Sequence, residues 1–154
     1  MTKTSEILTD VMTRCVGVRT LSSARAVTRH YDAALRPAGL TITQFTLLIV
    51  IGALRPSSIS EIGNWLSIER TSVTRNLKPL ERRGLIERKP EGAQRMRPVA
   101  LTVIGQQKLK ESYPFWQVAQ TEIETMLGES ELEKALNALA KLRSVDESFF
   151  DFPS

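Results

Sequence analysis

The stretch from Ile68 to Thr102 constrains the fold of this chain more than any other part of the sequence. After Gly84 it changes from helical periodicity to two short strand-like runs, 85–88 and 97–101, on either side of a basic tip that contains glycine. A helix with a cationic outer face followed by a basic hairpin suits a groove of DNA. The helical half places three apolar residues on one face and hydroxyl and basic residues on another: Val73, Leu77 and Leu80 against Thr71, Thr74, Arg75, Lys78 and Arg82.

Positive charge is concentrated in this same stretch. Between Glu69 and Arg97 there are nine basic and four acidic residues, a net charge of +5, whereas the whole chain carries +4 and the remainder therefore −1. Residues 111–154 are acidic, with nine acids and three bases. This polarity is typical of a protein that binds a polyanion. Most charge runs are ordinary solvated helix faces, however, so charge alone leaves both interpretations open.

Composition argues against several other classes of protein. The 154 residues, 42% of them hydrophobic, suffice for one core with a helical extension. No apolar run approaches the roughly 18 residues of a membrane-spanning helix, and the N-terminus lacks the apolar segment of a signal peptide. One cysteine and one histidine give neither a disulfide framework nor a zinc site. We expect a cytoplasmic protein with no membrane partner, no cofactor and no metal.

Helical periodicity also dominates before the basic stretch. Residues 5–36 are expected to form one helix that ends at Pro37 and Gly39. At 1.5 Å per residue it would be about 45 Å long, so part of it is expected to pack on a second subunit. Two shorter helices are expected at 44–54 and 61–66, capped by Thr43 and Ser60. The apolar centre of the first could also be a buried strand, and Trp65 is expected in the core of the second.

Two more helices are expected after the hairpin. Thr102 should cap a helix over 103–127 that contains Pro114 and ends at Gly128, and the aromatic residues around Pro114 are expected to belong to a core. Ser130 and Glu133 predict a capping box for a last helix over 131–150. The apolar stripe and phenylalanine-rich tail of this helix again favour a dimer, because an apolar terminus normally frays unless something buries it.

The order of these elements resembles the MarR family of bacterial transcription regulators, as do three strings: TITQFTLL (41–48), ISEIGNWLSIERTSVTRNLKPLERRGLIER (59–88) and RPVALTVIGQQ (97–107). The resemblance implies a mainly α fold with a small β wing. A winged helix-turn-helix DNA-binding domain would span 37–102, and interlocking helices at 1–36 and 103–154 would form a dimerisation region. It further implies a homodimer that binds a pseudo-palindromic operator in double-stranded DNA. Most members repress transcription, and many are released by a small aromatic or lipophilic ligand.

The resemblance assigns roles to the helix of the basic stretch. Arg75 is the best candidate for a bidentate contact to guanine, because its planar fork fits the two acceptors on that base edge. A plain phosphate contact is the alternative for Arg75. The residues expected in the major groove are Thr71, Ser72, Thr74, Arg75 and Lys78.

The hairpin would act as the wing. Arg88, Lys89 and Arg97 are expected to neutralise phosphates, and Arg95 is expected to enter a narrow minor groove. The family wing usually carries Asp-x-Arg, whereas this chain has Ala93 in place of the acid.

Two alternatives to a ligand-responsive regulator stay open. One branch of the family senses organic hydroperoxide through a cysteine near the tyrosine that Tyr31 resembles, so Cys15 and Tyr31 are a candidate redox or ligand pocket. The expected cysteine position falls on Gly17, however, and Cys15 on its apolar stripe also suits a small buried residue. The second alternative is a winged helix that contacts another protein. An enzyme is not expected, because no phosphate loop or catalytic dyad is present.

Overall fold

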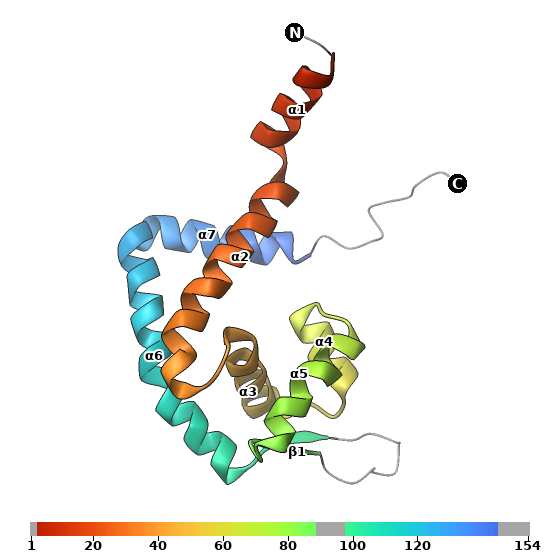
Figure 1. Cartoon of the computed structure of the whole chain (residues 1–154), viewed down its shortest axis with the longest axis vertical. Helices are drawn as coiled ribbons and strands as arrows, with labels where there is room; N and C mark the ends of the chain where they lie inside the picture. Colours follow the sequence, from red (N-terminus) through yellow and green to blue (C-terminus); the bar gives the residue numbers. More distant parts are fainter. Residues whose placement is uncertain (1–2, 89–97, 145–154) are drawn as a thin grey trace, which may run out of the picture.

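Helices and one two-stranded sheet make up the part of the chain that the structure, a computed structural model, describes, namely residues 3–88 and 98–144 (Figure 1). The predicted fold class, mainly α with a small β wing, is confirmed. The elements are α1 (Lys3–Arg14), α2 (Val16–Leu35), the 3-10 helix η1 (Arg36–Ala38), α3 (Ile42–Leu54), α4 (Ile59–Leu66), α5 (Arg70–Arg82), β1 (Ile86–Arg88), β2 (Val99–Leu101), α6 (Val103–Leu127) and α7 (Glu129–Leu142).

The hydrophobic core is centred on α3. This helix is apolar on all sides, and it lies in Figure 1 between the long helices α2 and α6 and the shorter pair α4 and α5. From the sequence, the centre of this segment could also have been a buried strand, and the structure shows a helix. The inward face predicted for α5 is confirmed, because Val73, Leu77 and Leu80 are fully buried. The sheet closes one end of the core through Ile86 and Val99, which are also buried.

The wing strands form an antiparallel pair in which Ile86 lies opposite Leu101 and Arg88 opposite Val99. They are shorter than the predicted runs, and the predicted tip, 89–97, lies outside the described residues. The sheet is tied to α6 at its base. Thr102 caps α6 as predicted, since its hydroxyl accepts a hydrogen bond from the Gly105 N–H at 3.0 Å and donates one to the Gly84 carbonyl at 2.5 Å.

The prediction of one continuous N-terminal helix is wrong. The chain breaks at Cys15, whose extended backbone (φ −70°, ψ 111°) makes it the N-cap of α2. Thr13, Val16, Gly17 and Val18 around the break are β-branched or glycine and have low helix propensity. Helix α1 contains no buried residue whose packing could offset that cost. The predicted stop is confirmed, because Gly39 adopts the left-handed conformation (φ 67°) after η1.

Three predicted helix starts are each displaced by two residues. Thr41, and not Thr43, caps α3, because Gln44 three residues later completes a capping box with it. Ser58, and not Ser60, caps α4, where its hydroxyl accepts a hydrogen bond from the Glu61 N–H at 3.2 Å. The last helix begins at Glu129 directly after Gly128, so Ser130 lies inside it. It ends at Leu142, and the predicted continuation over 145–150 lies outside the described residues.

The long helices α2 and α6 are held together by polar contacts as well as by packing. The Tyr31 hydroxyl donates a hydrogen bond to the side-chain oxygen of Gln120 at 2.5 Å. Burial and, secondarily, the negative charge of Glu124 raise the pKa of Tyr31, which keeps this donor protonated. His30 Nε2 lies 3.0 Å from the Ala119 carbonyl oxygen, so the ring nitrogen acts as the donor there.

No single helix within 3–88 and 98–144 is both long and apolar enough to cross a membrane. Within these residues, only the segments 16–38 and 42–54 taken together reach that length and hydrophobicity, and the chain bends by 77° between them.

Two helical glycines give a matched test of how closely α6 approaches the sheet. A Cβ at Gly105 would lie 1.9 Å from the Leu85 carbonyl oxygen, a main-chain atom that cannot move aside cheaply, whereas a Cβ at Gly17 would meet only the Cys15 sulfur at 3.6 Å. We expect Gly105→Ala to lower the free energy of unfolding by about 2 kcal/mol or more. Gly17→Ala should leave it unchanged or raise it by roughly 0.5 kcal/mol. Urea unfolding followed by circular dichroism measures both, and equal midpoints for the two variants would contradict the close approach.

Candidate nucleic-acid interface

The turn between α4 and α5 sets the outward position of α5. Ser67 adopts the left-handed conformation (φ 55°) at the end of α4, and the Ile68 N–H donates to the Gly63 carbonyl at 3.0 Å. A Cβ at Gly63 would lie 2.8 Å from the Ile68 carbonyl oxygen, so only glycine allows this close turn. The two helices and the sheet that follows them have the arrangement of a winged helix-turn-helix.

The outer face of α5 carries the residues predicted for the major groove. Arg75, Lys78 and Thr71 are exposed, while Ser72 and Thr74 are half-buried beside them. The hydroxyl of Thr74 already uses its proton within the helix, where it donates to the Arg70 carbonyl at 3.0 Å. Within residues 3–88 and 98–144, neither Arg75 nor Lys78 forms an ion pair. The structure therefore brings all five residues onto one side of the helix, with two cationic side chains directed to solvent.

Arg88 differs from the other predicted phosphate contacts. Its guanidinium forms a two-pronged ion pair with Glu81 of α5, in which Nη2 donates to Oε2 at 3.1 Å and Nε donates to Oε1. Both side chains are largely buried, with exposed fractions of 27% and 28%. Arg88 thus attaches the base of the wing to α5. Lys89, Arg95 and Arg97, together with the Ala93 position, lie outside the described residues, and their roles stay predictions.

Arg83 is a positioning residue that sequence reasoning missed. It follows the last residue of α5, and its Nη1 donates to the Gly39 carbonyl at 2.9 Å. This contact links the end of α5 to the bend between α2 and α3. Because the two residues are 44 positions apart, no local pattern in the sequence could have indicated it.

A cavity of 340 Å³, which we call the aromatic cavity, lies between α3, α4 and α6. Trp116 stacks with Phe45 (ring centroids 6.4 Å apart) and with Tyr113 (5.6 Å). The prediction that Trp65 is a core residue is wrong, since it is 45% exposed and lines this cavity. The reason is that α4 buries only a narrow strip, Ile62 and Gly63. The lining residues are Ile42, Phe45, Thr46, Ile49, Val50, Trp65, Tyr113 and Trp116.

A contact from the end of α7 reaches the rim of the aromatic cavity. The Arg143 guanidinium lies 5.4 Å from the centre of the Trp65 ring, within range of a cation–π interaction, and its Nη2 donates to the Trp65 carbonyl at 2.6 Å. Helix α7 thereby contacts α4 across the cavity.

Cys15 and Tyr31 do not form a site within one chain. They are separated by sixteen positions at opposite ends of α2, which corresponds to about 24 Å along a helix. Cys15 is half-buried at the N-cap of α2, where the Val18 N–H donates to its sulfur at 3.5 Å. It is therefore not the buried small residue that its apolar stripe also suggested. The redox role of Cys15 stays a prediction.

Similarity to known proteins identifies the family to which this arrangement belongs. The model of the MarR family matches residues 40–92, which contain α3, α4, α5 and β1. The M. tuberculosis transcriptional regulator MosR, solved in complex with DNA, is 35% identical, with a TM-score of 0.77 over 88% of this chain and 98% of that chain. This chain belongs to the MarR family.

Two further relatives show how far the likeness extends. Wild-type apo MarR from E. coli shares the fold, with 24% identity and a TM-score of 0.68 over 84% of this chain and 97% of that one. The uncharacterized HTH-type transcriptional regulator YwoH of Bacillus subtilis (strain 168) is 32% identical over 89 residues, which are 58% of this chain and 65% of YwoH. The match thus spans less than two thirds of that relative. The MarR family and fold are those of transcriptional regulators and not of enzymes, as expected from the sequence.

Because Arg88 is paired with Glu81 and Lys78 is not paired within the described residues, we expect the two cations to contribute differently to the free energy of unfolding. Arg88→Ala should lower the free energy of unfolding by about 1 kcal/mol, because it leaves the mostly buried Glu81 carboxylate without its partner. Lys78→Ala removes an exposed cation and should change the free energy of unfolding by less than about 0.5 kcal/mol. A double-mutant cycle between Arg88→Ala and Glu81→Ala measures the pair directly, and a coupling energy near zero would show that the pair does not hold the wing.

Proposed function

We propose that this protein is a homodimeric regulator of transcription that binds double-stranded DNA with α5 in the major groove and the wing beside it. The observation that carries the proposal is the division of α5 into a fully buried apolar face and an exposed cationic face. A helix held in this way presents its charge to a polyanion without desolvation cost in the free protein. The DNA complex of MosR, at 35% identity, supports the assignment.

The individual roles follow from exposure and reach. Arg75 lies near the middle of the exposed face and would read guanine, while Lys78 would neutralise a phosphate. Thr71, Ser72 and Thr74 would contribute hydroxyls to phosphate or base. In the wing, Lys89 and Arg97 would contact phosphate and Arg95 the minor groove. We remove Arg88 from the direct contacts, because Glu81 already occupies its guanidinium.

The dimer is supported by apolar surface that one chain leaves uncovered. Neither α1 nor α7 contains a buried residue, although both have apolar stripes. Met12 of α1 is 66% exposed and Leu136 of α7 is 57% exposed. Exposed apolar surface of this kind marks an interaction site. We assign residues 1–36 and 103–154 to dimerisation and 37–102 to DNA binding, so that the dimer would present two α5 helices to a pseudo-palindromic operator.

Repression with release by a small ligand is the mode of regulation we propose. The aromatic cavity supports it, because it lies where the long helix α6 meets α3 and α4, and the described residues that line it include no charged side chain. Such a lining suits an uncharged planar aromatic molecule. A ligand there would contact Trp65 of α4, and so could shift α4 and α5 relative to α6. A repressor of this kind acts in the cytoplasm, where the chromosome lies.

DNA recognition is tested with a duplex selected from a random library by the wild-type protein. Arg75→Ala should cost about 1–3 kcal/mol on that duplex and relax base preference at one position in each half-site. Lys78→Ala is the matched control. It should weaken binding to all sequences alike and lower the slope of log affinity against log salt by about 1, because one phosphate is no longer neutralised.

Two results would contradict the DNA-recognition proposal. If Arg75→Ala keeps the wild-type base preference, Arg75 does not read a base. If the wild-type protein shows no measurable duplex binding at low salt, α5 serves the alternative function of contacting another protein.

Ligand release can be followed by intrinsic fluorescence, because both tryptophans of the chain line the aromatic cavity. We expect 1-naphthol to quench this fluorescence saturably and, at saturation, to weaken operator binding about fivefold or more. Thr46→Phe should fill the cavity and abolish both effects while leaving DNA affinity without ligand unchanged. Quenching that persists in Thr46→Phe would place the ligand elsewhere, and quenching with unchanged DNA affinity would contradict the release mechanism.

A further inference from the structure

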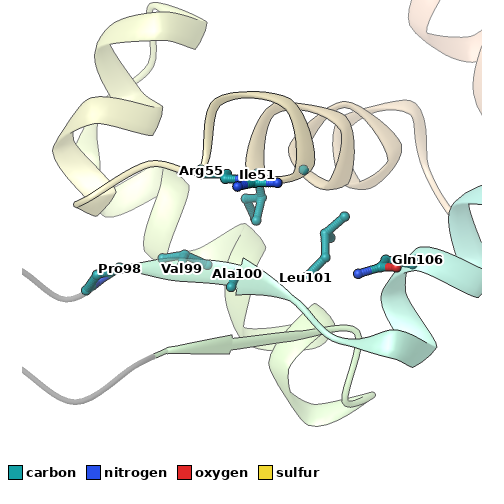
Figure 2. A pocket seen from close by; sticks show the side chains of 8 residues that line it. Ile51, Arg55, Pro98, Val99, Ala100, Leu101 and Gln106 are labelled. Carbon is teal, nitrogen blue, oxygen red and sulfur yellow. The ribbon is translucent and has the colours of Figure 1, made fainter.

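A second cavity, of 390 Å³, lies between the end of α3, strand β2 and the first turns of α6 (Figure 2). We call it the wing-base cavity. None of its described lining residues belongs to the aromatic cavity. In Figure 2, Ile51 of α3 and Arg55 directly after it lie on one side, Val99 and Leu101 of β2 on the other, and Gln106 of α6 at the end.

The cavity is bounded at one end by the contact between Gly52 and Leu101. A Cβ at Gly52 would lie 2.8 Å from the Leu101 Cδ1 atom, so the leucine side chain occupies the space that any larger residue at position 52 would need. Helix α3 and β2 therefore touch there. Arg55, which directly follows α3, is another lining residue of the cavity.

Arg55 occupies a backbone position at which glycine would cost less. It has left-handed dihedral angles (φ 48°, ψ 57°) directly after α3, where its N–H donates to the Ile51 carbonyl at 3.2 Å. A non-glycine residue in this conformation costs on the order of 1 kcal/mol, which is why glycine is the usual choice after a helix. Among the described residues of the lining, Arg55 is also the only charged one. An exposed cation held at an unfavourable backbone position, beside a cavity to which the described residues bring no acid, suits an anion.

The main chain of β2 supplies further polar groups. The Val99 N–H donates to the Pro56 carbonyl at 3.3 Å, so it points away from β1, whereas the Thr102 N–H donates to the Leu85 carbonyl. Because main-chain groups alternate along a strand, the N–H and C=O of Leu101 also point away from β1 and are not used by the β1–β2 pair. Leu101 and Gln106 both line the cavity. The apolar part of the wall is formed by Ile51 and Leu101.

We propose that the wing-base cavity binds a small monocarboxylate with an apolar body. The carboxylate pairs with the Arg55 guanidinium, which offers two parallel donors that match it, and the apolar body packs on Ile51 and Leu101. The Gln106 amide and the free edge of β2 bind further polar atoms of the ligand. Since the described lining residues all come from one chain and none lines the aromatic cavity, the site requires neither the aromatic cavity nor DNA.

The test uses the full-length protein, labelled at isoleucine and leucine methyl groups and at tryptophan indoles, and titrated with phenylacetate. We expect saturable shifts at the Ile51 and Leu101 methyls, with the indoles of Trp65 and Trp116 unmoved. Phenylacetamide, which has the same shape without the charge, should bind about tenfold more weakly. Arg55→Met should weaken phenylacetate binding about tenfold, and Arg55→Lys should weaken it less because it keeps the charge.

Arg55→Gly separates binding from folding. It relieves the left-handed strain, so it should raise the urea midpoint while it removes phenylacetate binding. Three results would overturn the proposal: shifts at the two indoles in place of Ile51 and Leu101, equal affinity for phenylacetate and phenylacetamide, or wild-type affinity in Arg55→Gly. Because no DNA is present, these outcomes are independent of whether the protein binds an operator.

Discussion

The burial of Val73, Leu77 and Leu80 against the central helix α3 is the interaction on which the rest of the structure depends. Each fully buried side chain of this size contributes roughly 1.5–3 kcal/mol. In a 13-residue amphipathic helix, placing that face inward decides which residues point outward. The cationic side chains of α5 stay in water, so their exposure has no desolvation cost. The same packing energy that stabilises the fold thus also creates the cationic surface that we propose binds DNA.

Polar contacts between distant parts of the chain then orient this surface. Arg83 attaches the end of α5 to the Gly39 carbonyl, and the Arg88–Glu81 pair attaches the wing to the same helix. Thr102 joins the sheet to α6 through Gly84. Each contact is modest in energy, but together they set the position of α5 and the wing relative to the long helices in the free protein. A basic residue of this surface can therefore serve the fold, as the pairing of Arg88 with Glu81 shows.

Helix α6 connects the two ends of the molecule. It packs along α2 and α3, and both cavities open beside it, at its first turns and near Trp116. The helices beyond it, α1 and α7, expose apolar stripes that one chain does not cover. Arg143 reaches back from α7 to Trp65, so the helix assigned to dimerisation contacts the DNA-binding half directly. Changes in the packing of the long helices can in this way be transmitted to α4 and α5.

Sequence periodicity and capping signals alone determined the mainly helical character of the chain, the inward face of α5, the two wing strands and the start and end of α6, because amphipathic spacing and local capping chemistry act within a few residues. The displaced starts at Thr41 and Ser58 were also readable locally, since Gln44 and Glu61 lie three residues after them. Only the tertiary structure decided that Cys15 interrupts the N-terminal helix, that Trp65 lines a cavity, and that Arg88 pairs with Glu81. These outcomes depend on how whole elements pack, which no local pattern specifies: α1 has no buried residue, α4 buries only Ile62 and Gly63, and the wing packs back against α5.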